Sequence, residues 1–506
     1  MRHDPSNIAV RNTFFGGIRL AIGVVATICT SAIMARTLGP ANMGAYSYTI
    51  WLAGTLGILA NIGLPAALTK FVSEFVGRGD SATAARLAKR LLIIQFAMAL
   101  GVSGATACFV VLRTPSSNII LLAAVMVLFQ ALLQGLTATL AGVQRFDRIA
   151  IISSYVALAQ VVSVIIARSL HAGVIGMLWA TLGGLLIGSW LSYRSVDRLL
   201  LKLSEPCPSS VVGMTDLYSR IRHFSLTLTY VLLLDTIIWQ RSEVLFLKWY
   251  SPLPELAFYT LAYSVASKFN EVASTFSGTL LPLFSASYGR NGLRDIGPIF
   301  LNATKYVQMG IVPLCLMGVV VAKPVVRLLY GTTYLPLVLP LQILIGSLAV
   351  TCIGAVGSPL VVGTGKQGFI AVWGTFVAIL NLVLDLMLIP RYGAVGAALA
   401  NSTAQVIGVL GGTVYVIRYT RTSFPWRSTA AIYVAAAIAV APAVYYHSAT
   451  ESGIAMRACT VTIGAILYVM ILVVTGELGK RDLVILRTAL LNKIPSVGPV
   501  EAADVA

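Results

Sequence analysis

Seven charged residues of this 506-residue chain lie within segments that are otherwise apolar. They are Arg19, Asp235, Arg241, Glu243, Lys268, Glu271 and Asp385. A charge in such a segment is costly unless it faces a water-filled cavity or an opposite charge, so charges of this kind often mark a functional site. Three are cations and four are carboxylates, so their sum does not by itself indicate an anion-binding cavity.

A purely structural explanation stays open for some of these charges. The long side chain of Arg19 could reach the membrane interface from its segment. Lys268 and Glu271 are three residues apart, so they share one face of a helix and could neutralise each other. Asp385 could be an interfacial carboxylate near the end of its segment. Asp235 and the nearby Arg241 are expected in the middle of one segment, where neither explanation fits.

The sequence contains no recognisable catalytic or metal-binding motif. "GTGKQG" at 363–368 matches a dinucleotide-binding fingerprint, but that site requires a preceding β-strand. Here the motif lies between two apolar segments and is expected to form a tight turn. Zinc-protease, Walker A and nucleophile-elbow motifs are not found. The absence of a Walker A motif argues against an ATP-driven pump on this chain. The six cysteines are never closer than 37 residues, so neither a zinc site nor a redox pair is predicted.

The composition defines the elements that must carry these charges. Hydrophobic residues make up 58% of the chain and charged residues 11%, and its mean hydropathy is +0.87. Soluble domains carry about 25% charged residues, so the surface of this protein must face lipid. A membrane-spanning helix needs about 20 apolar residues. We therefore predict an all-α integral membrane protein with about fourteen transmembrane helices. They are expected near 13–36, 42–66, 90–112, 118–143, 149–168, 173–193, 224–249, 256–284, 300–322, 336–362, 369–389, 393–417, 429–447 and 456–475.

The basic residues are distributed unequally between the two sides of the predicted membrane. With the N-terminus placed in the cytoplasm, 25 Lys and Arg residues fall in inner loops and tails, 8 fall in outer loops and 3 lie inside helices. This asymmetry follows the positive-inside rule and predicts that both termini are cytoplasmic. The net charge of +18 therefore belongs to membrane-flanking clusters and does not indicate a nucleic-acid partner.

The predicted helices form two sets of six, followed by two more. The longest polar interruption falls after the sixth helix, and its end at 216–223 suits a short helix on the membrane surface. The expected organisation is a six-helix lobe at 1–194, a cytoplasmic connecting loop at 195–223, a second six-helix lobe at 224–418, two additional transmembrane helices at 419–476 and a cytoplasmic tail at 477–506.

Weak sequence similarities relate the two sets. The segment 39–48 aligns with 252–261 at an offset of 213 residues, "GVQR" at 142–145 aligns with "GTGK" at 363–366 at an offset of 221, and "GVIGMLWA" at 173–180 aligns with "GAVGAALA" at 393–400 at an offset of 220. Because each set holds an even number of helices, both enter the membrane in the same direction. We therefore predict parallel repeats related by an axis along the membrane normal.

Several motifs resemble one transporter family. They are "ARTLGPANMGAYSY" (35–48), "NIGLPAALTKFVSE" (61–74), "LAGVQRF" (140–146), "LLYGTTYLPLVLPLQIL" (328–344), "GTGKQ" (363–367) and "NLVLDLMLIPRYGAVGAALANS" (381–402). Together they resemble the Wzx-type oligosaccharide flippases of O-antigen and exopolysaccharide assembly. This branch belongs to the MOP superfamily, which also holds the lipid II flippases and the MATE drug exporters. Asp385 departs from the family pattern, in which a second Asn often follows the one matching Asn381.

The resemblance implies a two-lobed, alternating-access transporter in the bacterial inner membrane, and not an enzyme. Its substrate would be an oligosaccharide on undecaprenyl diphosphate, moved from the inner to the outer leaflet for lipopolysaccharide or exopolysaccharide biosynthesis. Partners would be membrane lipid and proteins of polysaccharide polymerisation and export. A polyprenyl tail can stay in lipid, whereas a diphosphate and sugars cannot cross hydrocarbon unaided.

The resemblance also suggests roles for the buried charges. Arg19, Arg241 and Lys268 would bind the diphosphate, with arginine favoured by its fork geometry. Aromatic residues could stack on sugars, namely Tyr46, Trp239, Tyr259 and Tyr263. No cofactor is expected other than a coupling ion, H⁺ or Na⁺. The carboxylates that could carry this coupling are Asp235, Glu243, Glu271 and Asp385.

Other functions remain as alternatives. A MATE-type exporter of organic cations would share the fold, but it would favour an acidic cavity without Arg241 or Lys268. A membrane polymerase or glycosyltransferase usually carries catalytic residues in a large outer loop, and the outer loops predicted here are short. A structural scaffold would have no need of buried charges.

Overall fold

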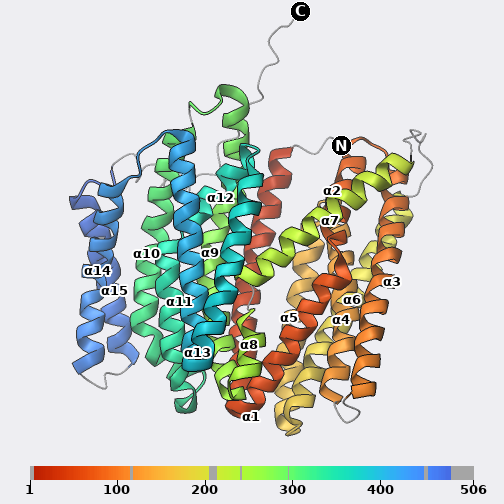
Figure 1. Cartoon of the computed structure of the whole chain (residues 1–506), viewed down its shortest axis with the longest axis horizontal. Coiled ribbons are helices and arrows are strands. Elements are labelled where there is room, and N and C mark those ends of the chain that lie inside the picture. Colours follow the sequence, from red (N-terminus) through yellow and green to blue (C-terminus); the bar gives the residue numbers. More distant parts are fainter. Residues whose placement is uncertain are drawn as a thin grey trace, which may run out of the picture.

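The computed structural model describes residues 5–113, 118–203, 214–239, 242–294, 296–449 and 454–479. Within these ranges every regular element is a helix (Figure 1). Nine of the described helices are long and apolar enough to cross a membrane. The prediction of an all-α membrane protein is therefore confirmed, while the number fourteen stays a prediction.

The first half of the chain contains six long or medium helices. They are α1 (Pro5–Asn61), α2 (Leu64–Gly77), α3 (Ser81–Arg113), α4 (Asn118–Gly142), α5 (Phe146–Ser169) and α6 (Gly173–Leu203). The remainder contains α7 (Met214–Trp239), α8 (Glu243–Tyr250), α9 (Leu253–Asn291), α10 (Ile296–Leu329), the short 3-10 helix η1 (Thr332–Leu337), α11 (Val338–Thr351), α12 (Gly354–Gly363), α13 (Gln367–Thr420), α14 (Trp426–Ala449) and α15 (Ile454–Val474).

Two of these helices are each a pair of helices joined at a bend. The backbone of α1 leaves the helical region at Gly39 (φ 72°, ψ 170°) and that of α13 at Gly393 (φ 53°, ψ −128°). A positive φ costs glycine little, whereas other residues rarely adopt it. Pro40 follows the first bend, and proline suits the first turn of a helix because no intrahelical partner is needed for its nitrogen. Each bend therefore lets one continuous element cross the bundle and return.

Several predicted helix boundaries were wrong. The segment 336–362 is not one helix, because α11 ends at Thr351 and α12 begins at Gly354. The segment 224–249 is not one span, because α7 ends at Trp239 and α8 begins at Glu243. The segment 216–223 is not a separate surface helix, because it forms the start of α7. Its apolar residues Leu217 and Ile221 are buried with side chains of α2 and α3, and the Arg90 guanidinium donates a hydrogen bond of 2.7 Å to the Tyr218 hydroxyl. Packing against the first half extends this helix beyond the apolar segment.

The aligned repeats have matching backbone geometry at their turns. Gln144 after α4 (φ 57°) and Gly365 after α12 (φ 73°) are both left-handed, and they are 221 residues apart. In each turn the next residue donates a 2.9 Å backbone hydrogen bond to the carbonyl five positions earlier, Arg145 to Leu140 and Lys366 to Val361. The motif at 363–368 is thus a helix-ending turn, and no β-strand accompanies it in the described ranges.

The two halves meet along α1 and α9, which pack against each other. Helix α1 also packs against α5, whereas α9 packs against α11 and α12. Helices α14 and α15 pair with each other, and α14 packs on α10, at the edge of the bundle (blue in Figure 1). At one end of the bundle α1 bends, α9 begins and α10 ends. We call this end, which is the lower edge of Figure 1, the Gly39 end.

Candidate functional site

A cavity of about 220 Å³ lies between the two halves of the protein. Residues of α1, α9, α10 and α11 line it, and its polar members are Thr27, Ser31, Ser264, Lys268 and Tyr330. The other lining residues are apolar or glycine. The cavity thus brings a cation and several hydroxyl groups together at the contact between α1 and α9.

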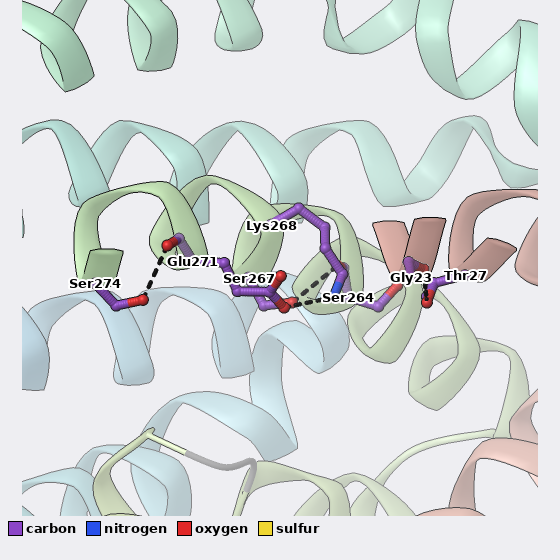
Figure 2. Close-up of polar contacts among 7 residues, drawn as sticks. All are labelled: Gly23, Thr27, Ser264, Ser267, Lys268, Glu271 and Ser274. Atoms are coloured by element: carbon purple, nitrogen blue, oxygen red, sulfur yellow. Dashed lines mark hydrogen bonds and ion pairs between the residues drawn. The ribbon is translucent and has the colours of Figure 1, made fainter. Parts of the chain in front are cut away.

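Lys268 is the cation of this cavity, and it forms an ion pair along α9. Its Nζ lies 2.5 Å from Glu271 Oε1, and the two side chains are 24% and 37% exposed. Figure 2 shows these residues in a row of polar side chains on α9, with Thr27 of α1 beside Ser264. The predicted shared face of Lys268 and Glu271 is therefore confirmed. Each charge is neutralised by the other while remaining accessible to a ligand.

A second cavity, of about 490 Å³, adjoins the first. It lies between α10 and the pair α14 and α15, and its lining is almost wholly apolar. The two cavities share Phe269, Gly318 and Val321. A Cβ atom at Gly318 would lie 3.0 Å from the Phe269 ring, so the missing side chain at 318 allows this ring to stand between the cavities. A cavity that contains Lys268 and an apolar cavity thus share a wall to which Phe269 contributes.

A cluster of buried polar residues lies elsewhere, between α8, α9 and α13. The carboxylates of Glu243 and Asp385 are both fully buried. Asn401 donates a 2.8 Å hydrogen bond to Glu243 Oε1, and Asn381 donates to the same oxygen over 3.3 Å. Asn381 also donates to the Ser242 hydroxyl, which in turn donates to Asp385 Oδ2, each over 3.1 Å. One hydrogen-bonded chain therefore links the two carboxylates.

The cluster holds more acceptors than donors. Asp385 Oδ1 has no hydrogen-bond partner among the described residues, and the Tyr259 hydroxyl interacts with both carboxylates. No described Lys or Arg forms an ion pair with either carboxylate. Buried carboxylates without a cation are strongly disfavoured in the charged state. The cluster is therefore suited to take up a proton or a small cation.

The structure places the predicted site residues in two groups. Lys268 lines the cavity and forms an ion pair with Glu271, whereas Glu243 and Asp385 belong to the buried cluster. Asp385 is not an interfacial carboxylate, because α13 and its neighbours enclose it completely. Arg241 and the side chains of Arg19, Asp235 and Trp239 lie outside the described residues; α1 carries Arg19 and the last turns of α7 carry Asp235.

Two of the predicted aromatic contacts are packing positions. Tyr259 is fully buried, and Tyr46 is buried with its hydroxyl 2.9 Å from that of Thr181. Sequence reasoning also missed the amides of Asn381 and Asn401. The signal was present, because Asn381 and Asp385 are four residues apart and therefore share one helical face.

The sequence profile described as "Polysaccharide biosynthesis protein" matches residues 9–287, more than half of the chain. The chain belongs to this family. A comparison with curated proteins found no match.

Solved transporter structures share the fold of this family member. One is the lipid II flippase MurJ in an inward-closed conformation, with a TM-score of 0.65 and 16% identity, covering 94% of this chain and 100% of that chain. Another is an inward-facing multidrug-resistance MATE transporter, with a TM-score of 0.62 and 16% identity, covering 80% and 99% of the two chains. A MOP superfamily transporter from Pyrococcus furiosus has a TM-score of 0.54 and 16% identity, covering 83% and 98%. The protein is thus a multi-pass membrane protein with the MOP transporter fold.

Proposed function

We propose that the protein is a flippase that moves undecaprenyl-diphosphate-linked oligosaccharide from the inner to the outer leaflet of the bacterial inner membrane. It would work by alternating access in surface polysaccharide biosynthesis. The family and the fold support a transporter in this process. The observation that carries the proposal is Lys268, an accessible cation in a mostly apolar cavity between the halves.

The chemistry of the cavity suits the two parts of such a substrate. Lys268 would bind the diphosphate, together with Arg19 and Arg241 as the sequence predicts, because charge-assisted hydrogen bonds to phosphate are strong. The hydroxyls of Thr27, Ser31 and Ser264 suit polar groups of the lipid-linked glycan. The adjoining apolar cavity would take the first carbons of the prenyl chain, which bury favourably in such surroundings. The polar and the apolar part of the substrate would thus bind in two cavities that both contain Phe269 in their lining.

The size of the cavity also has a consequence for the mechanism. Its volume of about 220 Å³ is below the range of about 300–1,000 Å³ that is typical for pockets of drug-sized ligands. An oligosaccharide is larger than such a ligand. The cavity must therefore widen for transport, as alternating access requires.

The buried cluster would carry the coupling to an ion gradient. Glu243 and Asp385 are better placed for this role than Glu271, because Lys268 already neutralises Glu271. Asp235 stays a candidate from the sequence. The coupling ion would be H⁺ or Na⁺, since two carboxylates and neighbouring amide and hydroxyl oxygens offer ligands that suit either. No other cofactor and no catalytic activity is proposed.

The proposed topology places both termini in the cytoplasm and the Gly39 end at the periplasmic face. This follows from the positive-inside distribution of basic residues. Partners would be membrane lipid, the lipid-linked oligosaccharide and proteins of polysaccharide polymerisation and export. Nucleic acid is not among them.

Substitution of Lys268 tests the proposal. We expect Lys268→Ala to abolish flipping of the lipid-linked glycan in proteoliposomes and polysaccharide export in cells, with membrane abundance close to normal. Lys268→Arg should retain activity, because it keeps a cation at the cavity. Lys366→Ala is the matched control, since Lys366 is exposed in the turn before α13. If Lys268→Ala instead depletes the protein, the lysine serves to neutralise Glu271. Normal flipping by this variant would show that Lys268 does not bind the diphosphate. Absence of flipping by the unaltered protein would instead favour a MATE-type exporter of cations, which drug-efflux assays would test.

A further inference from the structure

Three side-chain contacts join the two halves of the protein at the Gly39 end. The Arg36 guanidinium of α1 donates through Nε to the Leu329 carbonyl over 2.9 Å and through Nη2 to the Leu328 carbonyl. The Tyr334 hydroxyl of η1 donates to the Ala35 carbonyl over 2.8 Å. The hydroxyls of Ser31 and Tyr330 lie 3.3 Å apart. The contacts of Arg36 and Tyr334 connect the stretch 35–48 with the stretch 328–344.

The contacts are reciprocal helix caps. The last carbonyls of a helix have no partner within it and carry partial negative charge. Leu328 and Leu329 end α10, and Arg36 supplies donors and a positive charge to them. Ala35 lies in the last turn before the bend of α1, and Tyr334 supplies a donor to its carbonyl. Each half therefore caps a helix end of the other half.

The backbones also approach closely beside these caps. A Cβ atom at Gly44 would lie 2.1 Å from the carbonyl oxygen of Leu253, the first residue of α9. Gly44 and Leu253 come from the aligned segments 39–48 and 252–261 of the two halves. Only glycine at position 44 allows this approach. The contact at this end is thus held by side chains and by backbone packing.

The caps border the Lys268 cavity. Ser31, Leu329 and Tyr330 are among its lining residues, so the contacts form its wall toward the Gly39 end. Arg36 is exposed and can exchange the α10 carbonyls for water, which replaces protein hydrogen bonds at small net cost. Such contacts can break and re-form repeatedly.

We propose that Arg36, Tyr330 and Tyr334 form a latch that closes the Lys268 cavity at the Gly39 end and must open for the cavity to be reached from that side. The proposal rests on alternating access in the proposed function, and not on the identity of the substrate. It assigns to Arg36 and Tyr334 a role in the conformational equilibrium rather than in ligand binding.

Cysteine accessibility tests the latch. In a protein whose native cysteines are replaced, Ser264→Cys places one thiol in the cavity wall. A membrane-impermeant maleimide is applied to intact cells and to inverted vesicles. We expect Tyr334→Phe to raise labelling from the Gly39 side about fivefold, which corresponds to about 1 kcal/mol for one hydrogen bond. Arg36→Ala removes two hydrogen bonds and should raise labelling at least as much. Gly44→Val should raise it further, because the two backbones cannot then meet.

Two matched controls remove similar groups without touching the contact between halves. Asn42→Ala removes a side chain that hydrogen-bonds within α1, to the Leu38 carbonyl. Gly54→Val adds a side chain where no atom lies within 4 Å of a Cβ. Both should label at the parent rate. Unchanged labelling of Tyr334→Phe and Arg36→Ala, in protein that is monodisperse in detergent, would overturn the latch. That result is independent of glycan transport by Lys268 variants, so each proposal can fail alone.

Discussion

Replacement of Glu243 measures both what holds the buried cluster together and what it does. Glu243→Ala removes the acceptor of the 2.8 Å bond from Asn401, and a buried donor left unsatisfied costs about 1–3 kcal/mol. The 3.3 Å bond from Asn381 is weaker, and this amide also donates to Ser242, so its loss adds about 1 kcal/mol or less. We therefore expect Glu243→Ala to lower the free energy of unfolding by about 1–4 kcal/mol. Such a loss is large, because whole domains are stable by only about 5–15 kcal/mol.

Glu243→Gln separates the hydrogen bonds from the charge. Glutamine keeps one oxygen for both asparagines and places an amide at the position of Glu243 Oε2, in a side chain that interacts with Tyr259. That amide can donate toward the Tyr259 hydroxyl, so stability should change by less than about 1 kcal/mol. Glutamine cannot take up a proton or bind a cation as a carboxylate does. Transport by this variant should therefore no longer respond to a proton or sodium gradient.

The assays are thermal unfolding in detergent and flipping in proteoliposomes with imposed gradients of pH or Na⁺. The wild type should respond to one of the two gradients, and Glu243→Gln to neither. A Gln variant that is as unstable as the Ala variant would show that the charge itself holds the cluster. A Gln variant with the wild-type gradient response would remove Glu243 from ion coupling.

Two further changes probe the architecture. Gly63→Ala should lower the thermal stability by several degrees, because Gly63 has φ 65° and a Cβ there would lie 2.5 Å from the Ser225 carbonyl of α7, whereas Gly77→Ala, with no atom within 4 Å, should not. Equal melting temperatures for these two variants would argue against the tight contact of α2 with α7. Reporter fusions after Ala506 and within residues 196–215 should both report a cytoplasmic location, as the distribution of basic residues predicts. A periplasmic signal from either would refute the topology.

The sequence was sufficient for those parts of the fold that depend on periodic or local signals. Long apolar segments predicted the helices, and the weak alignment of 142–145 with 363–366 predicted turns whose geometry proves to be the same. The break between α7 and α8 was missed because the polar residues at 240–243 were interpreted as charges within one apolar span and not as the end of a helix. The beginning of α7 was missed because Leu217 and Ile221 are buried against the other half of the protein, and a local pattern cannot show the partner.

In the candidate site, too, contacts within one helix could be predicted from the sequence, whereas contacts between helices could not. The pairing of Lys268 with Glu271 follows from helical spacing alone. The meeting of Glu243 with Asp385 depends on tertiary packing, since 142 residues separate them. Asn401 joins them from the second arm of α13, which returns past the first only because of the bend at Gly393. No spacing rule for a single helix could have brought these three residues together.

Helix α9 connects the latch, the buried cluster and the Lys268 cavity, to which the proposals assign separate roles. Its first residue, Leu253, meets Gly44 beside the latch. Tyr259, two turns further, interacts with Glu243 and Asp385, and Ser264 and Lys268 follow in the cavity. From Leu253 to Lys268 the helix rises about 22 Å, at 1.5 Å per residue. A helix with intact hydrogen bonds transmits displacement along its axis more readily than it absorbs it. If the proposals hold, neutralising the carboxylates, binding an anion at Lys268 and opening the latch would all act on α9, and we therefore expect ion uptake and substrate movement to be coupled through this helix.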